Sequence, residues 1–187
     1  MILEGTLVRL EPLAPHHAEA LTEAAADRSS YGWTSVPEGR AAMAAHIEEL
    51  IAGDGVVPFA QVRRADGRPV GMTRYLTLRP HAVEIGGTWL AADAQRTGIN
   101  REAKLLLLEH AFAVLGVGRV DFVTDARNEQ SRNGIAGIGA TFEGILRGWQ
   151  PSRVAGEEGQ LRDSAMFSIV AGEWPAVREA LRARLAS

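Results

Sequence analysis

A polar run at residues 95–100, Gln-Arg-Thr-Gly-Ile-Asn, leads directly into a leucine-rich segment with helical spacing. The first N–H groups of a helix have no partner within the helix, and the helix dipole places positive charge beside them. Gly98 permits the backbone conformations and close approach that an anion needs, while Arg96 and Arg101 add charge suited to a diphosphate. The run therefore predicts an anion site, although a glycine-containing loop with two surface arginines explains these residues equally well.

Two familiar phosphate-binding motifs are absent from this region. A Walker loop ends in Gly-Lys-Ser/Thr, and the dinucleotide fingerprint reads Gly-x-Gly-x-x-Gly. Neither pattern occurs in the segment AQRTGINREAKLLLLEHAF, residues 94–112. A nucleotide bound here would need another kind of phosphate site.

The composition argues against several other functions. A net charge of -3 over 187 residues argues against a nucleic-acid partner, because phosphate backbones bind to basic faces. The absence of cysteine excludes disulfides, thiolate zinc sites and a cysteine nucleophile. No stretch approaches the ~18–20 apolar residues of a membrane span, and the start lacks the features of a signal peptide. We therefore expect a cytoplasmic protein without membrane or nucleic-acid partners.

Apolar spacing and turn residues predict the elements that position this run. Asp66-Gly67 between two alternating segments is a strong hairpin signal. Adjacent hairpin strands beside a β-α-β unit imply a mixed sheet with helices on both faces, in a single domain of residues 1–187. Strands are expected at 5–13, in two runs within 58–78, and at 82–91, 119–126, 141–149 and 161–171; helices are expected at 15–27, 38–53, 128–140 and 173–186, and from 94–112 to an end near Gly116 or Gly118.

Two landmarks give the chain a resemblance to the GNAT acyltransferases, and within them to the RimJ/RimL-like branch. The first is a Glu-Ile-Gly strand carrying Glu84, followed by the run at 95–100. The second stands here as Asn128, Ser131, Gly139-Ala140 and Glu143-Gly144. Their order and the surrounding strand pattern match over roughly residues 1–175. The resemblance implies an α/β (α+β) GNAT fold, with a mixed, mostly antiparallel sheet of about six or seven strands that splay apart at the cofactor site.

The same resemblance implies acetyl-CoA as the acyl donor and no metal. The loop would cradle the pyrophosphate with Arg96, Thr97, Gly98, Ile99, Asn100 and Arg101. The pantetheine arm would lie between the strands at 82–91 and 119–126. It would pair with main-chain groups of Trp89, Leu90 and Ala91, and Asn128 and Ser131 would approach it from the other side.

The implied reaction is transfer of an acetyl group to a primary amine. An alkyl amine has a pKa near ~10, so a base or a water chain must remove its proton at neutral pH. Without cysteine, direct attack in a ternary complex replaces an acyl-enzyme. A main-chain N–H near Leu90 or Ala91 would polarise the carbonyl as an oxyanion donor.

Glu84 is the candidate base. It lies eleven positions before Gln95, the spacing of the glutamate base in several GNAT enzymes. Strand alternation predicts that Glu84 shares one face with Gly86, Thr88 and Leu90, and that Trp89 lies on the other. A solvated or ion-paired glutamate, with water removing the proton, is the alternative.

Ser131 is the candidate general acid. Many GNAT enzymes carry a tyrosine seven residues after the asparagine, but this chain has Ile135 there. Asn128 and Ser131 would equally well serve only as a helix cap. A second departure is Asn100, where the family prefers glycine or alanine, but asparagine tolerates left-handed backbone.

The acceptor stays open at this level. Aromatic and imidazole side chains that would contact it, or simply pack in loops, are Tyr31, Trp33, His81 and Trp149. Three arginines suit a carboxylate and two glutamates suit a cationic amine, namely Arg74, Arg147 and Arg153 against Glu157 and Glu158. The candidate acceptors are therefore a protein N-terminus, an antibiotic, an amino acid and a polyamine.

Two further interpretations compete with the enzyme. A CoA-binding sensor without turnover would keep the loop, and an unrelated binding module would show no CoA affinity. The apolar stripe of the last helix, with Trp174 and Leu181, would pack within the chain or support a homodimer. His16 and His17 are expected to face solvent, and we identify no metal-ligand set.

Overall fold

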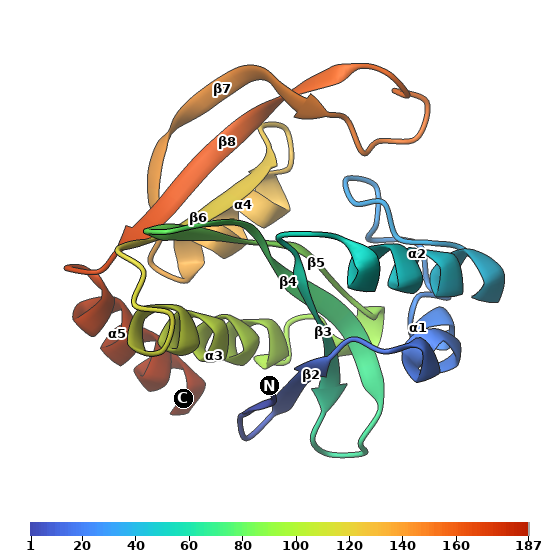
Figure 1. The fold of residues 1–187 in the computed structure, drawn as a ribbon, viewed down its shortest axis with the longest axis horizontal. Coiled ribbons are helices and arrows are strands. Elements are labelled where there is room, and N and C mark those ends of the chain that lie inside the picture. Colours follow the sequence, from blue (N-terminus) through green and yellow to red (C-terminus); the bar gives the residue numbers. More distant parts are fainter. Residues whose placement is uncertain (187) are drawn as a thin grey trace.

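A twisted sheet of eight strands forms the centre of the computed structural model, which describes residues 1–186 (Figure 1). The order is β1-β2-β3-β4-β5-β6-β8-β7, and every neighbouring pair is antiparallel except β5–β6. The mixed, mostly antiparallel sheet is confirmed, with the two-residue strand β1 in addition to the expected ones. The strands are β1 (Leu3–Glu4), β2 (Val8–Pro12), β3 (Val57–Arg63), β4 (Pro69–Arg79), β5 (Ala82–Leu90), β6 (Arg119–Asp125), β7 (Thr141–Pro151) and β8 (Leu161–Val170).

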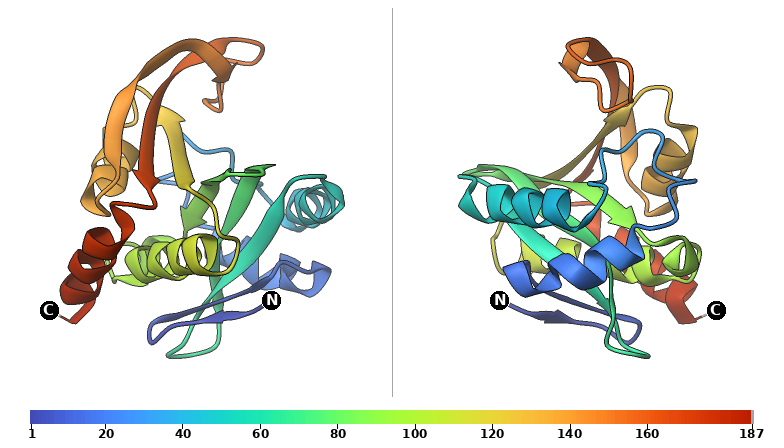
Figure 2. Two further views of the ribbon diagram at one scale, coloured as in Figure 1. Left: turned by 60° about the vertical axis from the view of Figure 1, so that its left-hand side comes forward. Right: turned by 90° about the vertical axis from the view of Figure 1, so that its right-hand side faces the viewer.

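Helices cover both faces of the sheet, as expected (Figures 1 and 2). One core lies beneath α1 and α2, and the other beneath α3 and α5. No helix within the described residues is both long and apolar enough to cross a membrane. The helices are α1 (Ala18–Ala24), α2 (Arg40–Ala52), α3 (Ile99–Ala113), α4 (Glu129–Gly137) and α5 (Trp174–Ala186), with short 3-10 helices η1 (Pro15–His17) and η2 (Ala92–Ala94).

Strands β5 and β6 diverge soon after they begin. Parallel pairing joins only residues 82–84 of β5 to residues 119–121 of β6. Strand β5 nevertheless continues to Leu90, and β6 to Asp125. Beyond Glu84, the edge of β5 that faces β6 therefore has no neighbouring strand. The splayed sheet predicted from the family resemblance is confirmed.

A β-bulge interrupts β5 at the start of this open edge. Arg74 of β4 lies opposite Gly86, whereas Met72 lies opposite Trp89. Strand β5 thus has one residue more than β4 over this stretch, which is the defining feature of a bulge. Gly87 adopts a φ of 55°, a left-handed conformation that favours glycine.

The bulge reverses the side-chain alternation of β5. Trp89 packs in the core beneath α1 and α2, the face on which Glu84 also lies. Thr88 and Leu90 face α3 instead, where Leu90 joins the second core. The expectation that Glu84, Gly86, Thr88 and Leu90 share one face is therefore wrong beyond Gly86, because a period of two does not survive an inserted residue.

Glu102, in the first turn of α3, holds the turn between β1 and β2. Its carboxylate accepts hydrogen bonds from the main-chain N–H groups of Thr6 (2.8 Å), Leu7 (2.7 Å) and Val8 (2.8 Å). Gly5 is pressed against it, since a Cβ there would lie 2.4 Å from Glu102 Cδ. These bonds fix the start of α3 against the sheet.

Replacing Glu102 by alanine is expected to lower the free energy of unfolding by about 3 kcal/mol, because main-chain donors lose their acceptor. Glu102→Gln keeps one acceptor oxygen and should lose less. Urea unfolding of the three proteins measures the difference. A Glu102→Ala protein as stable as wild type would contradict this structural role of the carboxylate.

Candidate functional site

The start of α3 presents main-chain N–H groups that no helical bond uses. Gly98 is the N-cap, with φ 90° and ψ -19°, and no side chain caps the helix. The first intrahelical bond runs from the Glu102 N–H to the Gly98 carbonyl, at 2.9 Å. Arg96 also has a left-handed φ of 60°. The free donors that precede this bond belong to Ile99, Asn100 and Arg101.

Two side chains brace the loop from inside. The Gln95 amide donates to Ser30 Oγ (2.7 Å) and to the Leu90 carbonyl (3.0 Å). The Thr97 hydroxyl donates to the Ala94 carbonyl at 2.6 Å. These bonds tie the loop to the end of β5, so loop and strand are positioned together.

The arginines of the loop differ in what they contact. Arg101 donates to the main-chain carbonyl of Arg184 in α5 at 2.9 Å, so its guanidinium is directed toward that helix. The contribution of the Arg101 charge to the anion site stays a prediction. Arg96 is exposed and has no ion pair in the described part of the chain. Ile99 is buried in the core and contributes only its main chain.

The main chain of β5 divides its hydrogen bonds between two edges. The Ala91 N–H donates to the Val70 carbonyl of β4 at 2.7 Å. Because main-chain groups alternate in direction along a strand, those of Trp89 also face β4, while those of Thr88 and Leu90 face the open edge. Of the three residues predicted to pair with an extended ligand, only Leu90 is therefore oriented to do so, and Thr88 joins it.

The Leu90 carbonyl is already used within the protein. It accepts from the Tyr31 hydroxyl at 3.0 Å as well as from Gln95. Tyr31 is buried and lies edge-on to Trp89, with ring centroids 5.8 Å apart. Tyr31 thus has a structural role at the end of β5, its contact with an acceptor stays a prediction, and the Leu90 N–H is left for a ligand.

Glu84 lies where β5 and β6 separate, in register with Asp121 of β6. The Glu84 carboxyl is half-buried and makes no hydrogen bond or ion pair to the described residues. Burial raises its pKa, and the charge of Asp121 raises it further, while Arg162, Arg79 and Arg74 oppose these effects. The ion-paired alternative for Glu84 does not apply, and a half-buried carboxyl with a raised pKa is the kind of group that functional sites use for proton transfer.

Asn128 caps α4, as the alternative interpretation proposed. Its Oδ1 accepts the Ser131 N–H at 3.0 Å. The Ser131 hydroxyl has no partner within the described residues. A Cβ on Gly134 or Gly137 would meet nothing within 4 Å. A tight helix–sheet contact therefore does not explain these two glycines, and the flank of α4 is open.

The remaining predicted contact residues lie in different surroundings. Trp33 is half-buried beneath the guanidinium of Arg127, 4.9 Å from its ring centroid. Trp149 is 56% exposed on β7, and His81 is exposed in the turn that precedes β5. His81 lies three residues before Glu84 along the chain, whereas no hydrogen bond or ion pair links Trp33 or Trp149 to Glu84.

Lys104 of α3 is buried behind the bulge, a position that the sequence did not reveal. Its ammonium donates to Thr88 Oγ1 (2.6 Å) and to Thr73 Oγ1 (3.3 Å). No carboxylate pairs with it among residues 1–186, and burial lowers its pKa to about 7. One pattern in the sequence could have indicated this burial. Lys104 lies one turn before the buried Leu107 and Leu108, on the apolar stripe of the helix.

His17 is buried, which corrects the expectation that it faces solvent. Its Nδ1 accepts the Ala14 N–H at 3.0 Å, and Nε2 lies 2.8 Å from Glu11 Oε1. Ligand atoms of Glu11, His16 and His17 come within 4.8 Å of one another, a grouping that the sequence did not lead us to expect. Both nitrogens of His17 are already engaged, so the group acts as a local brace.

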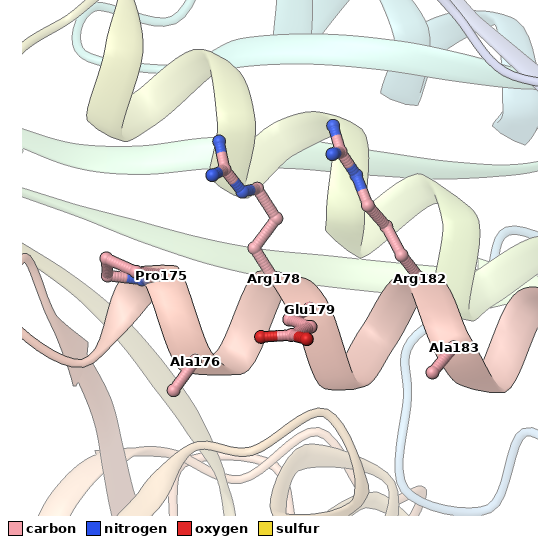
Figure 3. Close-up of a pocket in the computed structure, with 6 residues that line it drawn as sticks. All are labelled: Pro175, Ala176, Arg178, Glu179, Arg182 and Ala183. Atoms are coloured by element: carbon pink, nitrogen blue, oxygen red, sulfur yellow. The ribbon is translucent and has the colours of Figure 1, made fainter.

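Two hollows on the surface are lined by residues other than Glu84. One borders the loop and is lined by Thr97, Ile99 and residues of the neighbouring turns. Another runs along α5 and is lined by that helix alone, where Arg178 and Arg182 extend side by side (Figure 3). The apolar stripe of α5 packs inward, with Trp174 stacked on Phe112 of α3. That stripe is therefore not available to a second copy.

Comparison with known proteins identifies a family, to which the chain belongs. The acetyltransferase (GNAT) domain family matches residues 8–141. A GCN5-related N-acetyltransferase from Brucella melitensis is 30% identical, with a TM-score of 0.90 over 99% of this chain and 85% of that one. A putative acetyltransferase from T. thermophilus is 34% identical, with a TM-score of 0.86 over 98% of this chain and 96% of that one.

A more distant structure has the same fold. Mycobacterium smegmatis RimJ, solved in complex with CoA-disulfide, is 23% identical, with a TM-score of 0.78 over 95% of this chain and 88% of that one. The search of curated proteins returned no match.

The buried lysine makes a prediction for stability. Lys104 titrates near ~10.4 when unfolded and at about 7 when folded. Between these values the unfolded chain binds more protons, so the free energy of unfolding rises with pH. Lys104→Met lacks this titration and is expected to be the more stable protein at pH 7. Its advantage should shrink by about 3 kcal/mol by pH 10, as measured by urea unfolding. Parallel pH curves for the two proteins would contradict it.

Proposed function

Because the chain belongs to the GNAT acetyltransferase family, and is thereby an acyltransferase, we propose that it moves an acetyl group from acetyl-CoA to a primary amine. The observation that carries the proposal is one continuous feature. An uncapped helix start at residues 98–101 is tied to the end of β5, whose open edge runs back to a half-buried Glu84. A ligand lying along this feature would meet a candidate anion site at the helix start, then the open edge of β5, and then a candidate base at Glu84.

The residues present fit coenzyme A. The N–H groups of Ile99, Asn100 and Arg101, together with the Arg96 side chain, would hold the pyrophosphate. The open edge at Thr88 and Leu90 would pair with the amide-bearing arm. The Asn128 amide nitrogen, left free by the cap, would meet the arm from α4. When bound, acetyl-CoA supplies the activated acyl group as a thioester.

The chain's own groups divide the proton transfers. Glu84 would take a proton from the acceptor ammonium, directly or through water. The Leu90 N–H would stabilise negative charge on the thioester oxygen. The Ser131 hydroxyl, without a partner among the described residues, would give a proton to the departing sulfur and recover one from the newly acylated nitrogen. The nitrogen–carbon bond forms as the carbon–sulfur bond breaks, by direct attack in a ternary complex because the chain has no cysteine.

A CoA-binding sensor without turnover is the rival, and thiol release separates the two. We propose titrating acetyl-CoA calorimetrically and then measuring free CoA over a panel of amines. Binding with release establishes the transferase. Binding with no release from a panel spanning peptides, amino acids, polyamines and aminoglycosides favours the sensor, and absence of binding contradicts the CoA assignment.

A negative charge at the helix start should weaken CoA binding. Asn100 is exposed in the first turn of α3, so Asn100→Asp introduces repulsion toward a diphosphate while favouring the helix itself. The expected result is a CoA dissociation constant raised at least about tenfold, a change of about 1.4 kcal/mol, with an unchanged melting temperature.

Asn100→Ala is the matched control, because it removes the side chain without adding charge. Gly98 is less suitable as a target, since a Cβ there would lie 2.9 Å from Leu7 Cδ1 and the backbone is left-handed. Equal CoA affinity for Asn100→Asp and Asn100→Ala would place the pyrophosphate elsewhere.

Removing the base should change turnover but not CoA binding. Glu84→Gln is expected to lower kcat by about 100-fold or more and to abolish the acidic limb of the pH–rate profile. In wild type that limb should lie above the ordinary range of a glutamate, because burial and Asp121 raise the Glu84 pKa. A Glu84→Gln protein with wild-type kcat across the pH range would show that water alone suffices.

A further inference from the structure

Two half-buried arginines on the Glu84 face have no ion-pair partner among residues 1–186. The Nε atoms of Arg74 on β4 and Arg162 on β8 are buried and have no hydrogen-bond partner. Neither guanidinium forms an ion pair with a residue in the range 1–186, and the Arg162 Nη2 donates only to the neutral Gln150 side chain, at 2.7 Å. Arg9 also has a buried, unpartnered Nε, but it pairs with Glu11 at 2.7 Å.

Such an arrangement is unfavourable without a ligand. Removing a guanidinium from water costs free energy that only an opposite charge or hydrogen bonds recover. Burial lowers the pKa of both Arg74 and Arg162, and the charge of Arg153, in the loop between β7 and β8, also lowers it. The charges of Glu84 on both, Glu49 on Arg74 and Asp125 on Arg162 oppose these effects. Arg74 and Arg162 lie close enough to Glu84 for their charges to lower its pKa, and Arg153 lies close enough to both arginines to lower theirs.

Gly87 shapes the position of Arg74. An ideal Cβ on Gly87 would lie 2.3 Å from Arg74 Nε and 2.6 Å from Cζ. The bulge at the start of the open edge of β5 thus also leaves room for the Arg74 guanidinium. Gly87 therefore places the Arg74 guanidinium next to the strand edge that is proposed to receive the cofactor.

The acidic residues that suggested a cationic acceptor are already engaged. Glu157 lies 2.8 Å from Arg127 and accepts from Ser152 at 2.5 Å. Glu158 accepts the Gly156 N–H within its own loop, at 2.9 Å. The loop beside the three arginines therefore offers a cation, Arg153, and no free carboxylate to an incoming molecule.

We propose that Arg74, Arg153 and Arg162 form an anion subsite beside Glu84, so that the acceptor is an amine carrying a carboxylate or phosphate close to its nitrogen. The inference rests on the proposed acetyl transfer and names its substrate class. Guanidinium groups bind both oxyanions through paired N–H donors. Glu84 would then receive the amine while the arginines hold the oxyanion, which fixes the nitrogen for attack.

The test compares acceptors that differ only in charge. Thiol release from acetyl-CoA is measured with free amino acids against their amides, and with phosphoethanolamine against ethanolamine. We expect kcat/KM for at least one anionic member to exceed that of its neutral partner at least about tenfold, which measures the difference in transition-state stabilisation between matched substrates. The amino-acid and phosphate pairs distinguish a carboxylate from a phosphate. Equal use of both members, or preference for the neutral one, overturns the subsite.

Variants locate the preference in the structure. Arg74→Gln and Arg162→Gln should raise KM for the anionic acceptor, so that kcat/KM becomes similar for the two members of each pair. Acetyl-CoA affinity should stay unchanged. Arg178→Gln, an exposed arginine on α5, is the control and should retain the preference. If kcat/KM falls equally for both members of a pair, these arginines have a general structural role and the proposal is overturned.

A binding measurement keeps the inference separate from turnover. Inorganic phosphate is added to the protein with and without saturating CoA, and melting temperatures are compared. Wild type and Arg178→Gln should be stabilised, whereas Arg74→Gln and Arg162→Gln should not respond. If phosphate changes the melting temperature of none of the four proteins, the subsite is overturned even if amines are acetylated. An arginine-dependent response without thiol release from any amine would support the subsite and contradict the transferase.

Discussion

The early separation of β5 from β6 is the constraint on which the rest of the structure depends. Three parallel pairs end at Glu84, and the remaining length of β5 then carries main-chain groups without a neighbouring strand. An unpaired strand edge inside a domain is costly unless something completes it. The bulge at Gly87, the loop that follows the strand and the first turn of α3 all border this edge, so a ligand that completes it also reaches the helix start.

Polar groups around the edge are arranged by charge as well as by hydrogen bonding. Behind the strand, Lys104 reaches Thr88 without a carboxylate partner among the described residues. On the Glu84 face, Arg74 and Arg162 lie close enough for their charges to lower the pKa of that carboxyl. A buried lysine on one side and half-buried arginines without ion pairs on the other cost stability in the free protein, and functional sites are where such costs are retained. The protein thus has an ordinary core and, along the open edge of β5, a set of polar groups that are available to bind ligands.

Much of the fold followed from the sequence, because period-two strands, helical spacing and the Asp66-Gly67 turn are local signals. The helix start was also predictable from Gly98 and the polar run before it. The bulge was not, because an extra residue is defined by the register of two strands and not by one. That single feature changed which side chain accompanies Glu84. Burial of Tyr31 and Lys104 likewise depends on contacts with distant residues, and for these two the local pattern indicated only an aromatic loop and a polar helix position.

Main-chain amide hydrogen exchange at β5, followed by NMR with and without acetyl-CoA, tests the central claim most directly. If the open edge receives the arm, exchange at Leu90 should slow on binding, while Ala91, already bonded to Val70, should hardly change. Thr88 is expected to follow Leu90. Binding of acetyl-CoA with no change at Leu90 would contradict the account, because the cofactor would then lie away from the gap between β5 and β6.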